Sequence, residues 1–210
     1  MSARIALRPA LFGERERTLL TMPGFECATF RFDSGVEALR IRNARGEIVM
    51  LPFRGQQVWR AAFDGRELAM RSMFEAPSRS TDYLRTYGAF FIHCGLTGLG
   101  APGPHDTHPL HGELPNAAFD DAAVKIDEAN GTLCVTGSYR HTVAFSTDYR
   151  AVSRTVIGRD AGRLDISLDV LNLKQTPMDL MYLGHANFRP VDGGRLVYSA
   201  PYSPESVRVR

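Results

Sequence analysis

Histidines are the residues of this chain whose spacing most directly suggests chemistry. His105, His108 and His111 follow one another at H-x-x-H-x-x-H spacing, and His93 lies twelve residues before the first of them. Imidazole nitrogens are ligands that zinc and iron accept, and the neighbouring carboxylates could add an oxygen. The spacing is not one of the regular metal motifs, however. A metal site therefore stands as one hypothesis beside solvated side chains or groups that hydrogen-bond a carbohydrate.

His185 has a different setting. It follows the apolar, strand-like run Met178–Leu183 and precedes Asn187. A histidine at the end of a strand can act as a general acid or base, because its ordinary pKa lies near working pH. The alternative is a ring whose nitrogens are satisfied by backbone carbonyls. The spacing alone leaves both open.

Arg54 and Cys94 are weaker candidates. Arg54 lies in the turn Pro52–Gly55, where a guanidinium could bind a ligand's hydroxyl or carboxylate or simply face water. Cys94 adjoins His93, but neighbours on a strand point to opposite faces, so a thiolate–imidazole pair is not expected. The chain has no G-x-S-x-G, P-loop or G-x-G-x-x-G motif, so acyl-transfer and nucleotide chemistry lack their usual signals.

The elements that must position these residues show an apolar period of two, in short runs separated by Gly, Asn, Asp or Pro. This pattern predicts an all-β fold, an antiparallel β-sandwich with little helix. Only Leu11–Leu20 and Thr81–Tyr87 could form short helical turns. Strands are expected at residues 27–33, 36–42, 47–51, 57–63, 122–127, 133–139, 149–157 and 163–171.

We expect one domain over residues 1–210, with an N-terminal extension at 1–24 and a long irregular loop at 87–119. The loop holds four of the six histidines and is rich in Pro and Gly. Long irregular connections inside compact β proteins are usually functional or mobile. The loop is therefore the segment in which we expect binding residues.

Composition narrows the class of protein. The net charge of +2 comes from 25 basic and 23 acidic residues spread along the chain, which gives no field of one sign for nucleic acid. No apolar run approaches a membrane span, and the N-terminus lacks the apolar stretch of a signal peptide. Three cysteines without metal-type spacing indicate free thiols in a reducing cytoplasm. We expect no cofactor.

An ordered set of segments resembles the aldose 1-epimerase, or galactose mutarotase-like, superfamily, and most closely its uncharacterised branch. The segments are Leu51–Gly55 before a Trp-containing strand, Phe91–Pro102 leading into Pro109–Asn116, and Leu180–Phe188. The second and third carry most of the resemblance, with a His-Gly after the long loop and a histidine between a Tyr-Leu strand and an Asn-Phe pair. The resemblance extends from about residue 25 to the end of the chain.

The resemblance implies an antiparallel supersandwich with a sugar-binding groove and the interconversion of sugar anomers by acid/base ring opening. Within it, His185 matches the general acid at the ring oxygen, His111 matches a histidine that hydrogen-bonds the sugar, and Arg54 matches a substrate-positioning arginine. The partner would be a small carbohydrate. Further groove residues expected on this basis are Asn187, His108 and Trp59.

Two departures from the family pattern qualify this expectation. The family's general base is a glutamate on a late strand, and the one carboxylate that could be tried after His185 is Glu205, which does not resemble the base motif. The chain is expected to lack about the last third of the sandwich, and unpaired edges should then promote a homodimer. Glu113 also stands where relatives carry an arginine. Alternatives are an inactive sugar-binding sandwich and a metal-dependent isomerase or lyase that uses the histidine loop.

Overall fold

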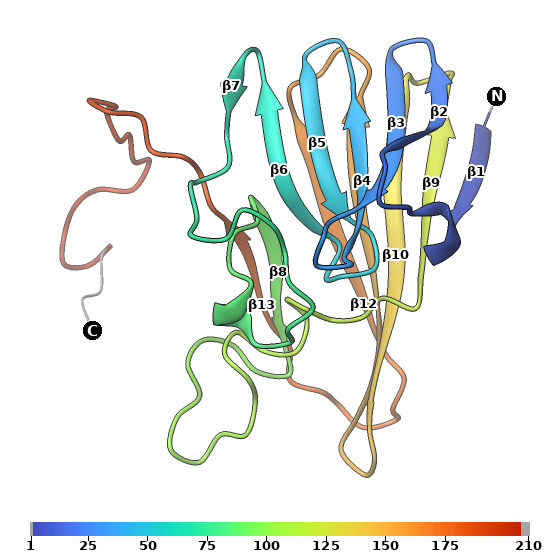
Figure 1. The fold of residues 1–210 in the computed structure, drawn as a ribbon. Helices are drawn as coiled ribbons and strands as arrows, with labels where there is room; N and C mark the ends of the chain where they lie inside the picture. Colours follow the sequence, from blue (N-terminus) through green and yellow to red (C-terminus); the bar gives the residue numbers. More distant parts are fainter. Residues whose placement is uncertain (1, 207–210) are drawn as a thin grey trace.

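Two antiparallel sheets contain nearly all the regular structure in residues 2–206, the part of the chain that this computed structural model describes. The five-stranded sheet has the order β1 (Ser2–Leu7), β9 (Asp121–Asp127), β10 (Thr132–Val143), β11 (Thr147–Gly158), β12 (Leu164–Asn172). Figure 1 shows strands of this sheet behind those of the second sheet. No helix of the described residues has the length and apolar character needed to span a membrane.

The second sheet has eight strands and carries the segments that build the site. Its order is β13 (Met181–Ala186), β8 (Phe91–Leu96), β6 (Gln57–Phe63), β5 (Gly46–Leu51), β4 (Glu37–Arg42), β3 (Phe25–Arg31), β2 (Arg17–Met22), and β7 (Arg66–Glu67) pairs with β6. Two short 3-10 helices complete the elements, η1 (Pro9–Leu11) and η2 (Tyr83–Arg85).

The predicted all-β antiparallel sandwich is confirmed. Alternation along the strands sends one set of side chains between the sheets, where Ile41 and Met50 share a core with Val124 and Leu133. Burying each such side chain contributes about 1.5–3 kcal/mol. The hydrophobic period therefore accounts for the two-layer architecture.

A second apolar cluster covers the other face of the eight-stranded sheet. Trp59, Ile92 and Cys94 point to this face from β6 and β8, and Tyr83 of η2 packs against them. Trp59 is only 1% exposed. The expectation that Trp59 lines a groove is therefore wrong, because its ring belongs to this core and supports the segments above it.

The structure differs from the sequence prediction in two segments. The expected N-terminal extension supplies an edge strand to each sheet, since β1 pairs with β9 and β2 pairs with β3. The expected irregular loop at 87–119 contains the strand β8, which pairs with β13 along its whole length. In both cases the strand forms because it pairs with a neighbouring strand. Short runs that contain charged or Gly residues carry no sequence signal for that pairing.

Candidate functional site

His111 and His185 come together on the face covered by the second apolar cluster. Their imidazole centroids lie 5.8 Å apart in an edge-to-face arrangement. Tyr83 packs against His111 at 4.8 Å between centroids, and Tyr87 packs against His185 at 5.9 Å. The two histidines that the sequence singled out for sugar chemistry thus form one aromatic cluster, although 74 residues separate them.

The conformation of His111 is set by backbone hydrogen bonds at the end of β8. Its N–H donates to the carbonyl of Gly100 at 3.0 Å, and its carbonyl accepts from the N–H of Gly95 at 2.8 Å. His111 has φ 60° and Gly112 has φ 80°. A Cβ on Gly112 would lie 2.4 Å from the carbonyl oxygen of Gly98, so the His-Gly pair needs glycine at its second position.

Asn187 positions Tyr87, which packs against the His185 ring. Its side-chain Nδ2 donates to the carbonyl of Ala89 at 2.9 Å, and its Oδ1 accepts from the Tyr87 hydroxyl at 2.7 Å. Asn187 is 7% exposed. The residue therefore holds Tyr87 against His185, and both polar groups of its side chain are engaged within the protein.

The electrostatics of the pair favour a neutral His111. Burial, together with the positive charge available on His185, lowers the pKa of His111 below its ordinary value. The Nδ1 atom of His111 is buried and has no hydrogen-bond partner. A protonated ring would leave an N–H unsatisfied there, which costs free energy. His111 is thus suited to donate or accept a hydrogen bond as a neutral ring beside His185.

Glu113 turns inward from the same loop. Its carboxylate accepts from the hydroxyl of Tyr149 at 2.6 Å, from the hydroxyl of Thr97 at 2.8 Å and from the N–H groups of Thr97 and Leu96. Burial acts to raise the pKa of Glu113, but these hydrogen bonds lower it below its ordinary value. Glu113 therefore ties the His111 turn to the end of β8 and to β11.

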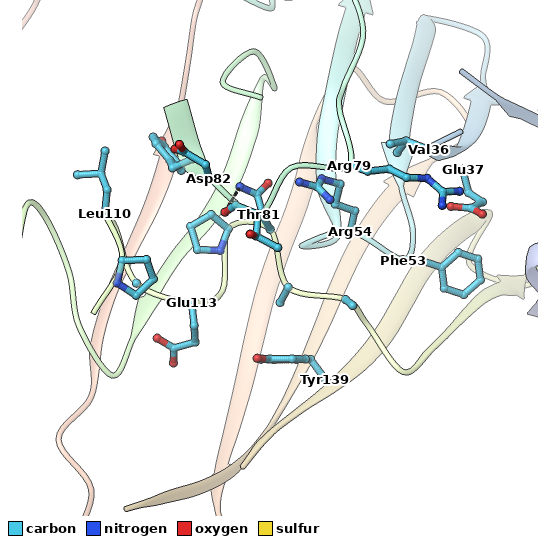
Figure 2. Close-up of a pocket in the computed structure, with 17 residues that line it drawn as sticks. Val36, Glu37, Phe53, Arg54, Arg79, Thr81, Asp82, Leu110, Glu113 and Tyr139 are labelled. Atoms are coloured by element: carbon cyan, nitrogen blue, oxygen red, sulfur yellow. Dashed lines mark hydrogen bonds between the residues drawn. The ribbon is translucent and has the colours of Figure 1, made fainter. Parts of the chain in front are cut away.

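A cavity of about 800 Å³ lies next to the His111 turn, and neither His111 nor His185 is among the described residues that line it. Figure 2 shows side chains that line it. Tyr83 and Gly112 belong to its wall, which places the cavity directly beside His111. Its polar lining residues are Glu37, Arg54, Arg79, Thr81, Asp82, Glu113, Asn116 and Tyr139. A ligand in contact with the histidines could extend a substituent into this space.

Arg54 reaches the cavity from the turn between β5 and β6. Gly55 in this turn has φ 56° and donates its N–H to the carbonyl of Ala117 at 2.8 Å. A Cβ there would lie 2.1 Å from the carbonyl oxygen of Pro115, so this close approach requires glycine. The Arg54 guanidinium donates to the carbonyl of Ser80. Burial lowers the pKa of Arg54.

The histidine loop does not assemble a metal centre. Among residues 2–206, no three His, Cys, Asp or Glu side chains lie close enough to hold a metal ion. His105 is exposed. His108 covers Gly98 and places its Nδ1 2.8 Å from the carbonyl of Pro109, on its own turn. The three-histidine hypothesis thus has no ligand cluster in the described chain, and no contact joins His108 to the histidine pair in that part.

His93 points away from the site, as the alternation along a strand predicts. Its ring is fully buried between the sheets, with Nε2 2.9 Å from the Ser153 hydroxyl and Nδ1 2.8 Å from the Tyr182 hydroxyl. Burial lowers its pKa to about 4. Cys94 lies on the opposite face, where burial raises its pKa to about 11. His93 is therefore a neutral bridge between the sheets.

Sequence reasoning missed the two tyrosines of the site. Tyr83 and Tyr87 flank the histidine pair from a segment that carried only a weak helical signal. Tyr87 lies four residues after Tyr83, and the segment contains Asp82, which caps η2 by accepting from the N–H of Leu84. The aromatic pair in Thr81–Tyr87 was the available signal.

A family model described as "Domain of unknown function (DUF4432)" matches residues 33–196. This chain belongs to that family. The match spans every residue of the DUF4432 protein that builds the histidine pair and the cavity. No match was found among curated proteins.

The fold of the DUF4432 protein is similar to that of a solved structure from Klebsiella pneumoniae subsp. pneumoniae, a "putative aldose 1-epimerase". The TM-score is 0.72 at 15% sequence identity, and the similarity covers 90% of this chain and 56% of that chain. The DUF4432 protein thus spans little more than half the length of this structural relative. The resemblance expected from the sequence is confirmed at the level of the fold.

Proposed function

We propose that this DUF4432 protein binds a monosaccharide at the histidine pair and catalyses the interconversion of its anomers. The observation that carries the proposal is the edge-to-face contact of His111 and His185 near a cavity of mixed polar and apolar lining, on a sandwich with the fold of a putative aldose 1-epimerase. Aromatic rings and neutral hydrogen-bonding groups are the surroundings that a sugar ring requires.

In the proposed reaction, His185 donates a proton to the ring oxygen while the anomeric hydroxyl releases its own proton to a base. The C1–O5 bond breaks, the aldehyde turns about C1–C2, and ring closure reverses both proton transfers. His111, held neutral by burial and by His185, hydrogen-bonds the sugar and fixes its orientation. Tyr87 supports the His185 ring, and Asn187 supports Tyr87.

A second candidate function is sugar binding without catalysis. Among residues 2–206, no carboxylate lies within ion-pair distance of either imidazole of the pair. The fold and cavity would bind a sugar, but the described residues would then lack a carboxylate base at the anomeric hydroxyl. This arrangement would retain affinity and lose turnover.

Anomer exchange and binding separate the two candidates. Exchange of freshly dissolved α-D-galactose, α-D-glucose and α-D-xylose is followed by polarimetry and NMR, and binding is measured by calorimetry. We expect the wild-type protein to accelerate exchange of at least one sugar and His185→Asn to abolish it. Binding without acceleration would favour the second candidate, and absence of both would reject a site for these neutral monosaccharides.

A further inference from the structure

The acidic side chains of the cavity already have partners. Glu37 pairs with Arg31 at 3.0 Å, and Asp82 at the rim caps η2 and lies 3.4 Å from Arg85. Glu113 accepts from the Tyr149 hydroxyl and from the N–H of Thr97, which follows β8. In Figure 2 its carboxylate points away from Arg54. The carboxylates that line the cavity are therefore engaged with groups other than Arg54.

The two arginines of the cavity differ from these acids. Neither Arg54 nor Arg79 lies within 4.0 Å of a carboxylate in the described chain. Arg79 stands at the exposed rim and donates to the carbonyl of Gly35 at 2.8 Å. Arg54 is half-buried and donates to the carbonyl of Ser80, while its Nε atom is buried without a hydrogen-bond partner. Arg54 is thus a partly desolvated cation with unused donor capacity.

A half-buried cation with an unpaired donor is suited to bind an anion. Removing a charged group from water costs free energy unless a partner of opposite charge and hydrogen bonds replace the water. A sugar hydroxyl could accept one hydrogen bond from the guanidinium, but it could not neutralise the charge. A carboxylate or phosphate does both, because its oxygens match the planar donor fork of arginine.

We propose that the ligand of this cavity carries an acidic substituent, a carboxylate or a phosphate, which binds Arg54. The inference rests on the proposed function, since the sugar ring would lie against His111 and the substituent would extend past Tyr83 into the cavity. Tyr139 lines the same space, its hydroxyl lies 2.9 Å from Nδ1 of His141, and desolvation raises its pKa to about 12, so it stays protonated. Asn116 adds a neutral amide to the wall. The site would thus select an acidic sugar over a neutral one.

The test compares three probes by calorimetry with the same protein: D-galactose, D-galacturonate and D-galactose 6-phosphate. At least one anionic probe should bind the wild-type protein about tenfold or more tightly than galactose, as expected for a charge-assisted hydrogen bond. Comparing the affinities of D-galacturonate and D-galactose 6-phosphate shows whether the cavity binds a carboxylate or a phosphate. Raising the salt concentration should weaken binding of the anionic probe only.

Variants assign the preference to Arg54. Arg54→Gln should remove the preference for the anionic probe. Arg54→Lys keeps the positive charge without the planar donor pair of the guanidinium, and it should retain part of the preference. A folded Arg54→Lys variant that retains part of the preference shows that the loss in Arg54→Gln comes from the charge and not from misfolding. Arg66→Gln is the matched control, because Arg66 is exposed on β7 and does not line the cavity. Thermal unfolding of each variant checks that it is folded.

The outcomes distinguish this inference from the proposed function. Equal or tighter binding of galactose, a preference that survives Arg54→Gln in a folded variant, or no binding of any probe would overturn the inference. Anomer exchange of neutral sugars without a charge preference would leave the proposed function standing. Tight, Arg54-dependent binding of an anionic probe without exchange would support the inference and reject the epimerase.

Discussion

The imidazole rings of His111 and His185 contact each other edge to face, with 5.8 Å between their centroids. One ring comes from a left-handed turn held to the end of β8, and the other from β13, which pairs with β8. Burial, and to a smaller extent a positive charge on His185, lowers the pKa of His111. Neighbouring elements therefore place two histidine rings side by side.

Replacing His185 should change the pKa of His111. In His185→Asn the positive charge next to His111 is removed, so the pKa of His111 should rise, while burial keeps it below its ordinary value. Histidine titration by heteronuclear NMR measures this shift. His105→Asn is the control, since His105 is exposed on the long loop. An unchanged His111 titration in His185→Asn would show that the rings are not coupled.

His93 should make stability depend on pH between 6.5 and about 4. Its pKa is lowered from 6.5 to about 4 in the folded protein, so the unfolded chain takes up a proton first as the pH falls. The contribution of His93 to the free energy of unfolding should therefore be at its full value above pH 6.5. It should decrease as the pH falls toward 4, by about 3 kcal/mol at most.

Denaturant unfolding at several pH values measures the effect. His93→Gln keeps a polar group near Ser153 and Tyr182 but cannot titrate, so its stability should vary less over this window. His105→Asn controls for an exposed histidine and should follow the wild-type curve. A His93→Gln curve parallel to that of the wild type would assign the pH dependence to other groups.

Most of the core sheets could be predicted from the sequence, because β3–β6 and β9–β12 alternate strongly and are separated by turn residues. The ordered segments around Arg54, His111 and His185 also contain the residues that form the histidine pair and one wall of the cavity. The role of Asn187 could not be predicted, since it depends on Tyr87, which lies 100 residues away and donates to it. The inward direction of Glu113 depends on Tyr149 of the other sheet. Such contacts are properties of packing and have no local pattern.

Asn187→Ala should destabilise the protein more than Tyr87→Phe. The alanine leaves the part-buried Tyr87 hydroxyl and the buried Ala89 carbonyl without their partner, and the buried carbonyl alone costs about 1–3 kcal/mol, whereas Tyr87→Phe removes one hydrogen bond worth about 1 kcal/mol. Denaturant unfolding of both variants and of the double variant gives the coupling energy.

Sugar affinity separates the two roles considered for Asn187. If it acts through Tyr87, both single variants should weaken binding to a similar extent. A loss confined to Asn187→Ala would instead indicate direct contact with the ligand, as the sequence suggested.

Glu113→Gln should destabilise the protein by about 2 kcal/mol, because an amide has one acceptor oxygen and its NH2 group would face the donors of Thr97 and Tyr149. The lowered pKa of Glu113 fixes the sign of the pH dependence. The ionised Glu113 carboxylate contributes fully to the free energy of unfolding above its ordinary pKa of 4.5. This contribution is lost as the pH falls through the lower pKa of the folded protein. The difference between wild type and variant in denaturant unfolding should therefore shrink in acid. Glu75→Gln, at an exposed carboxylate, should show no such difference.

The open edge at β13 should drive self-association. Among the described strands β13 pairs only with β8, and Leu183 on it is 40% exposed. An apolar edge strand with free backbone groups is a template for a second copy, and a lysine on it opposes such pairing. Light scattering over a concentration series should show a dimer for the wild-type protein and a monomer for Leu183→Lys. Phe145→Lys, at an exposed apolar residue in the β10–β11 turn, should remain dimeric. A wild-type monomer at every concentration, or loss of the dimer in both variants, would place no interface at β13.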